Sequence, residues 1–480
     1  MRPLEIAVTI ALLPYVLHLL SPSRGENALF SLLPFVAVSL AVPHVLAEGY
    51  RWQMFPAYCL VIVFVAYESI RWIADLRAPY FAGVAALLFL FATIALSTAL
   101  PVFKIPVPTG RYKVGTQSRH IVDERRRDTF SDYSGGPREL MIQIWYPVDP
   151  SAQGQIAPYR DKRTTTLRDA RYALVKTHSV LGAQPATAQS RYPLLLYAPS
   201  WEGLRTESTF LMEELASHGY VVVGIDHPYS SRITVFPDGR IARRKFVGQE
   251  DYSSQAAFDG FINTANEQVD IRVSDARFVL DTLEQLNGHD PNGLLTGRLD
   301  FDRVGIFGFS FGGTTAAEAC WLDRRFKAGL DMGGMIAGAS ATQGTFAPFF
   351  FLFEGLYEAP PYVPGTDRAS LDPAKQREIR FTREQFKQMK RSLAEYGGYW
   401  MTIDGMMHGD FSDSPFTSPL RSTRADPETI ARVIGRYLVA FFDEQLTEVE
   451  QPLFDGLSPG LPGIRFQAWK ARVPSGTPGR

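Results

Sequence analysis

The residues best suited to covalent chemistry lie around Ser310. Glycines flank this serine two positions away on each side, at Gly308 and Gly312. A short β-prone run, residues 304–307, precedes the serine, and small residues suited to a helix packed on a sheet follow it. A serine at a sharp strand-to-helix turn presents its hydroxyl to a substrate, and the glycines remove side chains that would clash there. The pattern therefore predicts a nucleophilic serine.

The base that such a serine needs is predicted to be His408. A serine hydroxyl reacts well only when a base takes its proton and a third group orients that base. Of the eight histidines, only His408 follows Ser310. It comes shortly after a predicted strand, residues 399–403, so its loop would lie at the carboxyl edge of the sheet. A histidine in an ordinary surface loop is the alternative.

Two aspartates compete for the role of the orienting acid. Asp331 ends the strand predicted after the serine helix and lies about 20 residues beyond Ser310, which agrees with the chain order serine, acid, histidine. Asp323 is the competitor, but it adjoins Arg324 and Arg325 and is interpreted as a surface charge.

A metal site near His408 is the alternative to this acid–base interpretation. Asp404, Asp410 and Asp413 gather around His408, yet the chain has no HExxH motif or comparable ligand pair. We therefore expect no metal and no cofactor. Among the other histidines, only His227, which follows a strand end, is a candidate to line a pocket.

Acyl transfer also requires two hydrogen-bond donors for the negative oxygen of the intermediate. The backbone N–H of Phe311, directly after the serine, is the first candidate. The second is an N–H in the loop that follows residues 192–198.

The elements that must position these residues alternate between strand and helix beyond residue 106. This alternation predicts a mostly parallel sheet with helices on both faces. The predicted strands are residues 140–148, 192–198, 220–225, 304–307, 328–331, 348–353 and 399–403, and the helices are residues 207–217, 267–286, 372–396 and 427–446. Residues 152–188 are expected to be loop with some helix, and the tail, residues 451–480, loop or disorder.

The phenylalanine-rich run at residues 349–353 permits two interpretations. A proline precedes it and Glu354-Gly355 ends it, which favours a strand buried on both faces of a parallel sheet. A lipid-facing lid is the alternative.

The first part of the chain has the composition of a membrane region. Four apolar stretches, residues 4–20, 29–47, 55–70 and 81–103, each approach the roughly 20 residues that cross a bilayer. We expect four spanning helices rather than three that follow a cleaved leader. The expected organisation is a transmembrane region at residues 1–105, a catalytic domain at 106–450 and a tail at 451–480. Counting positive charges favours a cytoplasmic catalytic domain, and His18 and His44 are interpreted as packing or interfacial residues rather than a transport pathway.

Net charge and cysteine content argue against two further classes, nucleic-acid-binding proteins and folds held together by disulfides. The 480 residues carry a net charge of -1, which gives no sign of nucleic-acid binding. The two cysteines, Cys59 and Cys320, lie in an apolar run and a predicted helix. A disulfide framework is therefore not expected.

Several motifs together resemble the plasma type of the platelet-activating factor acetylhydrolase family, over roughly residues 140–450. They are Tyr192-Pro193-Leu194-Leu195-Leu196-Tyr197, Leu215-Ala216-Ser217-His218-Gly219-Tyr220, Gly308-Phe309-Ser310-Phe311-Gly312-Gly313, Leu330-Asp331, and His408 with Phe411-Ser412-Asp413. The resemblance implies an α/β-hydrolase fold and a calcium-independent serine esterase that removes short or oxidised acyl groups from an amphipathic ester or phospholipid. Ser310, Asp331 and His408 would form its triad, and Trp201 would give the second oxyanion N–H.

The chain departs from this family at two places. Pro199-Ser200 stands where the family usually has His-Gly before the oxyanion loop. The membrane region is similar to that of bacterial members with an N-terminal anchor, which implies a multi-pass protein of a bacterial inner membrane. Dienelactone-hydrolase-like esterases share much of the same core. A non-catalytic lipid-binding protein and an acyltransferase with the same triad are the alternative functions.

Overall fold

The structure, a computed structural model, describes residues 1–21, 28–74, 79–128, 130–131, 135–165, 169–246, 250–355, 372–420, 426–454 and 463–472. The chain divides into two compact units. The first comprises Met1–Lys104, Pro158–Lys176 and Pro415–Ser422, and the second comprises Ile105–Ala157, Thr177–Ser414 and Thr423–Arg480.

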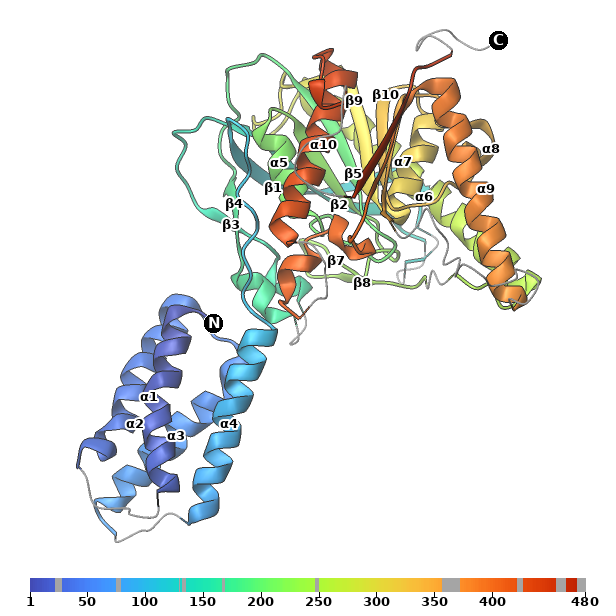
Figure 1. The fold of residues 1–480 in the computed structure, drawn as a ribbon. Coiled ribbons are helices and arrows are strands. Elements are labelled where there is room, and N and C mark those ends of the chain that lie inside the picture. The colour runs from blue at the N-terminus through green and yellow to red at the C-terminus, as the bar shows by residue number, and fades with distance from the viewer. Residues whose placement is uncertain are drawn as a thin grey trace. The chain divides into compact units, whose positions relative to one another are not determined.

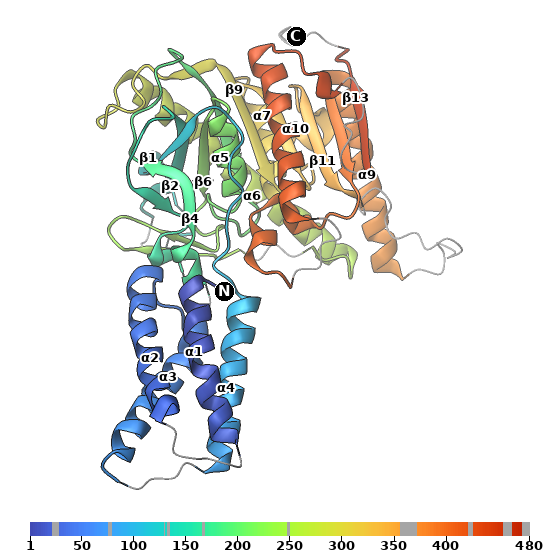
Figure 2. The ribbon, with the colours of Figure 1, turned by 60° about the vertical axis from the view of Figure 1, so that its left-hand side comes forward.

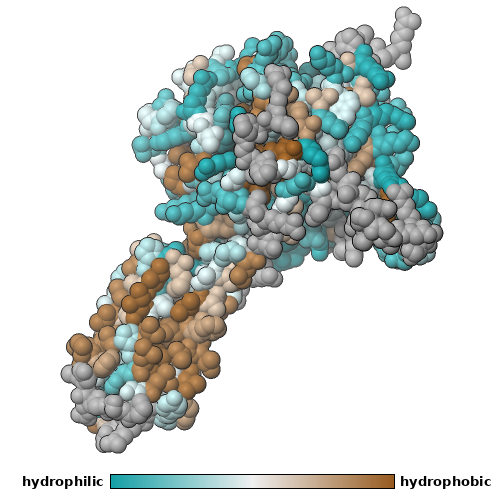
Figure 3. Space-filling view, in the orientation of Figure 1, coloured by the Kyte–Doolittle hydropathy of each residue, from teal (hydrophilic) through white to brown (hydrophobic). Residues whose placement is uncertain are grey.

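The first unit is built on a bundle of four helices (Figure 1). They are α1 (Pro3–Leu20), α2 (Ala28–Pro43), α3 (Phe55–Arg71) and α4 (Tyr80–Ala99), and a π-helical turn, His44–Glu48, extends α2. Large apolar side chains cover much of their outer surface (Figure 3). Each helix, with its extension, is long and apolar enough to cross a bilayer. The last helix ends at Ala99, four residues before the predicted end of that span.

The second unit is organised around a sheet of eleven strands in the order β13-β12-β11-β10-β9-β5-β6-β2-β1-β4-β3 (Figure 2). Neighbours from β6 through β5, β9, β10 and β11 to β12 pair in parallel, whereas β2 with β6, β1 with β2 and β13 with β12 pair antiparallel. The strands are β1 (Lys113–Arg127), β2 (Pro137–Val148), β3 (Ile156–Pro158), β4 (Lys176–Leu181), β5 (Tyr192–Ala198), β6 (Val221–Asp226), β9 (Leu299–Phe309), β10 (Phe326–Met332), β11 (Phe349–Glu354), β12 (Gly398–Ile403) and β13 (Ile464–Trp469).

Helices cover both faces of this sheet because its central strands are apolar on both sides. One face, with Leu194 and Leu196 of β5, packs on α6 (Gln255–Gly288), α7 (Phe311–Leu322) and α9 (Pro373–Tyr396). On the other face, α10 (Pro427–Thr447) brings Phe442 against Leu195 and Gly305. The short helix α5 (Thr209–Ser217) packs beside α10. This layered arrangement is the α/β-hydrolase fold that the sequence predicted.

Two open expectations are decided by these strands. The run at residues 349–353 is strand β11, which is completely buried between β10 and β12, so the lid alternative is wrong. The expectation of an unstructured tail is wrong for Ile464–Trp469, which forms the edge strand β13.

Candidate active site

The serine predicted as nucleophile lies at the turn between β9 and α7 in a strained conformation. Ser310 has φ 55° and ψ -123°, a backbone region that non-glycine residues rarely adopt. Its glycine neighbours are required by close contacts. A Cβ at Gly312 would lie 1.9 Å from the carbonyl oxygen of Ala198, and one at Gly308 would lie 2.1 Å from the carbonyl carbon of Gly312. The strand, turn and helix thus hold the serine hydroxyl outward at the carboxyl edge of the sheet.

The structure brings the predicted base to this serine. His408 Nε2 lies 3.0 Å from Ser310 Oγ, within hydrogen-bond distance. The histidine begins a 3-10 turn, His408–Phe411, in the loop after β12. This geometry allows the imidazole to accept the hydroxyl proton as the serine attacks.

The loop that carries His408 is anchored to the first turn of α5. The Asp413 carboxylate accepts hydrogen bonds from the backbone N–H groups of Thr209 and Phe210, at 2.8 and 3.1 Å. The Ser208 hydroxyl donates to the carbonyl of Phe411 at 3.1 Å. A carboxylate at a helix N-terminus satisfies free N–H groups and complements the helix dipole. The position of the histidine is therefore tied to a helix distant in sequence.

The carboxylate beside the other imidazole nitrogen is Glu354. Its Oε1 lies 3.2 Å from His408 Nδ1, and its side chain is 6% exposed. Glu354 is the last residue of β11. The sequence analysis treated it only as the end of a strand. An acidic residue directly after a buried parallel strand is the signal that would have identified it.

Asp331, the predicted acid, lies on the neighbouring strand and does not make this contact. Its Oδ1 accepts a hydrogen bond from the N–H of Gly334 at 2.7 Å. Within the described residues, no hydrogen bond or ion pair joins Asp331 to His408. The reason is strand order, because the loop of His408 leaves β12 and β12 is adjacent to β11, not to β10. In the described structure Glu354, rather than Asp331, lies beside His408 Nδ1, and the role of Asp331 as the acid stays a prediction.

Asp331 is nevertheless close to the site and electrostatically unusual. The side chain is completely buried, and its Oδ2 has no hydrogen-bond partner in the described part of the chain. Burial raises the pKa of the Asp331 carboxyl well above its usual value, the N–H of Gly334 acts to lower that pKa, and the nearby Glu354 raises it further. The folded protein therefore holds the proton of Asp331 more tightly than an exposed aspartic acid would.

Phe311 and Trp201, the residues predicted to supply the oxyanion donors, both line the cavity beside Ser310. The N–H of Phe311 is at the start of α7, where helical N–H groups have no partner within the helix. Trp201 follows β5, and its ring packs edge-on against the ring of Phe311, with centroids 4.1 Å apart. For neither backbone N–H is a hydrogen-bond partner found among the residues that the structure describes.

A cavity of about 300 Å³ opens beside Ser310. Its wall is largely aromatic and aliphatic, with contributions from Trp201, Phe261, Phe311, Phe386 and Met389, together with His408. The charged side chains among its described lining residues, apart from the histidine, are the carboxylates Glu250 and Glu378. Arginine and lysine are absent from that lining as described.

The other aspartates that the sequence analysis considered bind other groups of the protein. Asp323 pairs with Arg325 at 2.7 Å, but it is buried, so its interpretation as a surface charge is wrong. Asp410 accepts from the N–H of Met407 at 2.8 Å, and Asp404 pairs with Arg465. With Asp413 capping α5, these three aspartates form no common ligand set.

His227 does not line the cavity. The ring is completely buried, and its Nδ1 lies 2.9 Å from Asp275 Oδ2. Burial lowers the pKa of His227 to about 4, although Asp275 opposes that shift. The imidazole is therefore neutral near pH 7 and belongs to an internal hydrogen-bond network.

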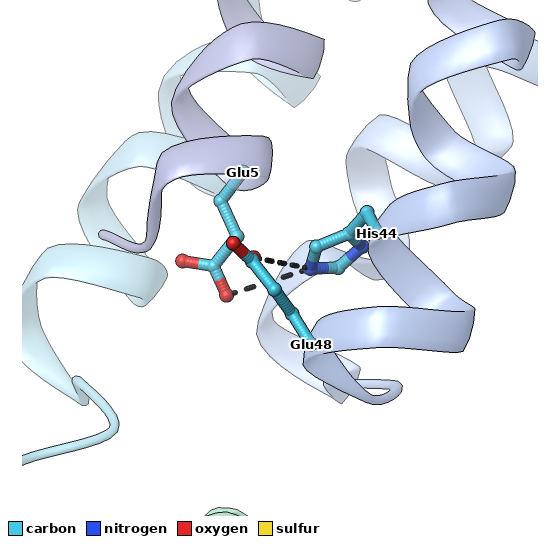
Figure 4. A group of neighbouring side chains, drawn as sticks. All are labelled: Glu5, His44 and Glu48. Atoms are coloured by element: carbon cyan, nitrogen blue, oxygen red, sulfur yellow. Dashed lines mark ion pairs between the residues drawn. The ribbon is translucent and has the colours of Figure 1, made fainter.

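A separate polar cluster lies in the helical bundle, where ligand atoms of Glu5, His44 and Glu48 come within 4.8 Å of one another (Figure 4). Arginines already bind these carboxylates. Arg51 Nη1 lies 2.7 and 2.9 Å from the two oxygens of Glu5, and Arg2 Nε lies 2.9 Å from Oε1. Two guanidinium groups beside the cluster would repel a metal cation, so we interpret it as an ion-pair network that joins helix ends.

Comparison with known proteins agrees with this geometry. The family described as "Platelet-activating factor acetylhydrolase, isoform II" matches residues 98–458. The chain is 26% identical over 272 residues to "Probable 1-alkyl-2-acetylglycerophosphocholine esterase" of Arthroderma benhamiae, covering 52% of this chain and 64% of that protein. It is 25% identical over 251 residues to the platelet-activating factor acetylhydrolase of Canis lupus familiaris, covering 49% and 51%. The chain thus spans between half and two thirds of the length of these curated relatives.

A solved structure supports the same fold. The ferulic acid esterase from Streptomyces cinnamoneus is 27% identical with a TM-score of 0.59, and the match covers 76% of this chain and 99% of that one. The family match extends over most of the chain, including the serine turn and the histidine loop. The chain therefore belongs to the platelet-activating factor acetylhydrolase, isoform II, family.

Proposed function

We propose that the protein is a serine carboxylic ester hydrolase that its N-terminal helices anchor in a membrane. The observation that carries this proposal is the 3.0 Å approach of His408 Nε2 to Ser310 Oγ at a strained strand-to-helix turn. Family membership and the esterase names of the relatives support the same class of reaction.

The proposed reaction passes through an acyl-enzyme. Ser310 Oγ attacks the ester carbonyl carbon while His408 Nε2 takes the hydroxyl proton. The N–H groups of Phe311 and Trp201 stabilise the negative oxygen of the tetrahedral intermediate. The carbon–oxygen bond to the alcohol then breaks, and His408 gives its proton to the leaving oxygen. Water repeats these steps on the acyl-enzyme to release the carboxylic acid and restore Ser310.

We further propose Glu354 as the acid that orients His408, with Asp331 as the alternative. The 3.2 Å distance to Nδ1 supports Glu354, and the position of Asp331 at the end of β10 supports the alternative. In either case the carboxylate would fix the imidazole tautomer and stabilise the imidazolium that forms during attack.

The proposed substrate is an amphipathic ester with a short acyl group, such as a phospholipid with a short sn-2 chain. A cavity of about 300 Å³ is at the small end of ligand pockets, which favours a short acyl chain. Four helices able to span a bilayer would keep the site close to lipid.

A fluorophosphonate probe tests the proposal on detergent-solubilised protein. We expect the wild type to be labelled and to hydrolyse a short-chain ester, and we expect Ser310→Ala and His408→Ala to do neither. A folded wild type that stays unlabelled would instead support a non-catalytic lipid-binding protein. If added alcohols intercept the acyl-enzyme better than water does, the protein is an acyltransferase.

A further inference from the structure

The loop after β5 turns three successive carbonyl groups toward one buried guanidinium. Arg272, on α6, is completely buried. Its Nη1 lies 2.8 Å from the carbonyl oxygen of Pro199, and its Nη2 lies 2.6 Å from that of Trp201. Both nitrogens lie 3.2 Å from the carbonyl oxygen of Ser200. The N–H of Gly203 also donates to the Ser200 carbonyl at 3.0 Å, but Arg272 is the side chain that contacts all three carbonyls.

The carboxyl group of Glu207 holds the opposite side of the loop. The N–H of Ser200 donates to Glu207 Oε1, and its hydroxyl donates to Oε2 at 2.8 Å. The Tyr197 hydroxyl also donates to Oε1, at 3.1 Å. The peptide between Pro199 and Ser200 is thus bound at its carbonyl by Arg272 and at its N–H by Glu207.

The geometry of a trans peptide also fixes the direction of the next N–H group, that of Trp201. In a trans peptide the C=O and the N–H point in opposite directions. Because Arg272 binds the carbonyl of Ser200, the N–H of Trp201 in the same peptide must point away from Arg272. Glu207 already takes the N–H of Ser200, whereas the N–H of Trp201 has no partner among the residues described here.

The loop so fixed lies against the serine turn. A Cβ on Gly312 would meet the carbonyl oxygens of Ala198 and Pro199 at 1.9 and 2.8 Å. Arg272 also stacks on the Phe311 ring, with its Cζ 5.0 Å from the ring centroid. The same guanidinium therefore contacts both segments that carry an oxyanion N–H.

Packing alone does not account for a buried arginine at this position. Removing a guanidinium from water costs several kcal/mol unless its donors are used. Here Nε and Nη2 also bind the Ser230 hydroxyl, at 3.3 and 2.7 Å, so the loop carbonyls and Ser230 together satisfy the guanidinium.

We propose that Arg272 is a positioning residue that holds the N–H of Trp201 in the oxyanion site. This inference rests on the proposed hydrolase function. It also explains how Pro199-Ser200 is compatible with an oxyanion loop, since the loop uses the carbonyl of Pro199 and does not need the N–H that proline lacks.

Arg272→Lys and Arg272→Met test this role. Lysine keeps the charge, but its single nitrogen cannot bind three carbonyls in the same fork. We expect kcat to fall by about 10²- to 10³-fold, as for loss of one oxyanion donor, with little change in KM. The Ki of a trifluoromethyl ketone, which forms a tetrahedral adduct on serine, should rise by the same factor. The Ki of an unreactive ether analogue of the substrate should stay constant.

Arg138→Met is the matched control. Arg138 is also buried and pairs with Asp275 and Asp128 at 2.7 and 2.8 Å, but none of its observed hydrogen bonds reaches residues 199–203. We expect this variant to lose stability while it keeps kcat and both inhibition constants.

Three outcomes would count against the inference, and one against the proposed function. The inference is overturned by wild-type kcat in folded Arg272→Lys, by equal increases in both inhibition constants, or by an equal loss of kcat in Arg138→Met. If wild-type protein hydrolyses no ester and resists the fluorophosphonate, the proposed function fails regardless of Arg272.

Discussion

Two buried carboxyl groups end neighbouring strands at the site, Glu354 beside His408 on β11 and Asp331 on β10. Like charges in a shared low-dielectric site disfavour double ionisation, so one group keeps its proton. Glu354 faces His408 Nδ1, and its charge raises the pKa of Asp331. Burial, with Glu354 as a further cause, thus makes Asp331 a carboxyl that holds its proton tightly.

Substitution of each carboxyl by its amide separates their roles. We expect Glu354→Gln to lower kcat by several orders of magnitude, because an amide no longer holds the imidazole in the reactive tautomer. Asp331→Asn mimics the protonated acid and should keep most of the activity. Steady-state kinetics on a short-chain ester measures both. If Asp331→Asn loses more activity than Glu354→Gln, then Asp331 rather than Glu354 orients the histidine.

The pH dependence of stability provides a second measurement on Asp331. Its folded-state pKa lies above the ordinary value of 3.8, so the folded protein holds this proton more tightly than the unfolded chain does. The free energy of unfolding should therefore fall as pH rises from about 4 through the folded-state pKa. Asp331→Asn lacks this titration and should gain stability relative to the wild type as pH rises. Denaturant midpoints at pH 5 and pH 8 measure the change, and a constant difference would contradict it.

Among the elements, α5 connects the two loops of the site. The oxyanion loop leads into this helix, and the histidine loop caps it through Asp413. A change at the start of α5 should therefore affect both stability and catalysis.

Removal of this cap should have both effects. We expect Asp413→Ala to reduce the free energy of unfolding by about 0.5–2 kcal/mol and also to lower kcat, because the loop that holds His408 loses its anchor. Asp426→Ala is the control, since Asp426 caps α10 through the N–H of Thr429 at 2.9 Å and lies on the surface. It should lose similar stability and keep its kcat. Equal kcat in the two variants would show that the histidine loop does not depend on this cap.

The elements that sequence could predict are those with a strong apolar signal. Strands β5 and β11, and β9 from Val304 onward, are buried on both faces and appear in the sequence as continuous apolar runs. Strands β1 and β13 were missed because much of each is polar and partly exposed. Their pairing partners, rather than their own side chains, make them strands, and pairing is not visible in a single segment.

The site could be predicted only where chain order and local motif sufficed. Ser310 has a distinctive turn sequence, and His408 is the last histidine. The sequence analysis weighed Asp331 against Asp323 and did not consider Glu354, although Glu354 ends β11 and Asp331 lies next to the last residue of β10. Only the order of strands in the sheet decides which carboxyl faces the histidine. The role of Arg272 depends on three carbonyl contacts more than 70 residues away in sequence, and no motif records such contacts.

At the scale of the whole molecule, the proposed catalysis and the proposed membrane anchoring belong to different units. All residues proposed for catalysis lie in the second unit, and the helices able to span a bilayer lie in the first. Removal of residues 1–100 retains Phe103, whose ring packs on Tyr159 and Tyr172 with centroids 5.2 and 5.8 Å apart. The shortened protein should hydrolyse a water-soluble short-chain ester with unchanged kcat.

The same truncation should reduce hydrolysis of esters presented in lipid vesicles. Without its helices the protein would reach the bilayer only by diffusion from solution, so the rate per enzyme molecule should fall. Parallel assays with soluble and vesicle-bound esters measure the difference. If both rates are unchanged, anchoring has no part in delivering substrate.

The carboxylates in the cavity wall affect the end of the reaction cycle. Hydrolysis turns a neutral ester into an anionic acid, and the described wall offers that anion Glu250 and Glu378 but no arginine or lysine. Glu378 is paired with Lys375 at 2.8 Å, so Glu250 is the carboxylate of the described wall that disfavours the ionised acid relative to the neutral ester. Product inhibition by short carboxylates should consequently be weak, so that turnover continues as acid accumulates around the membrane.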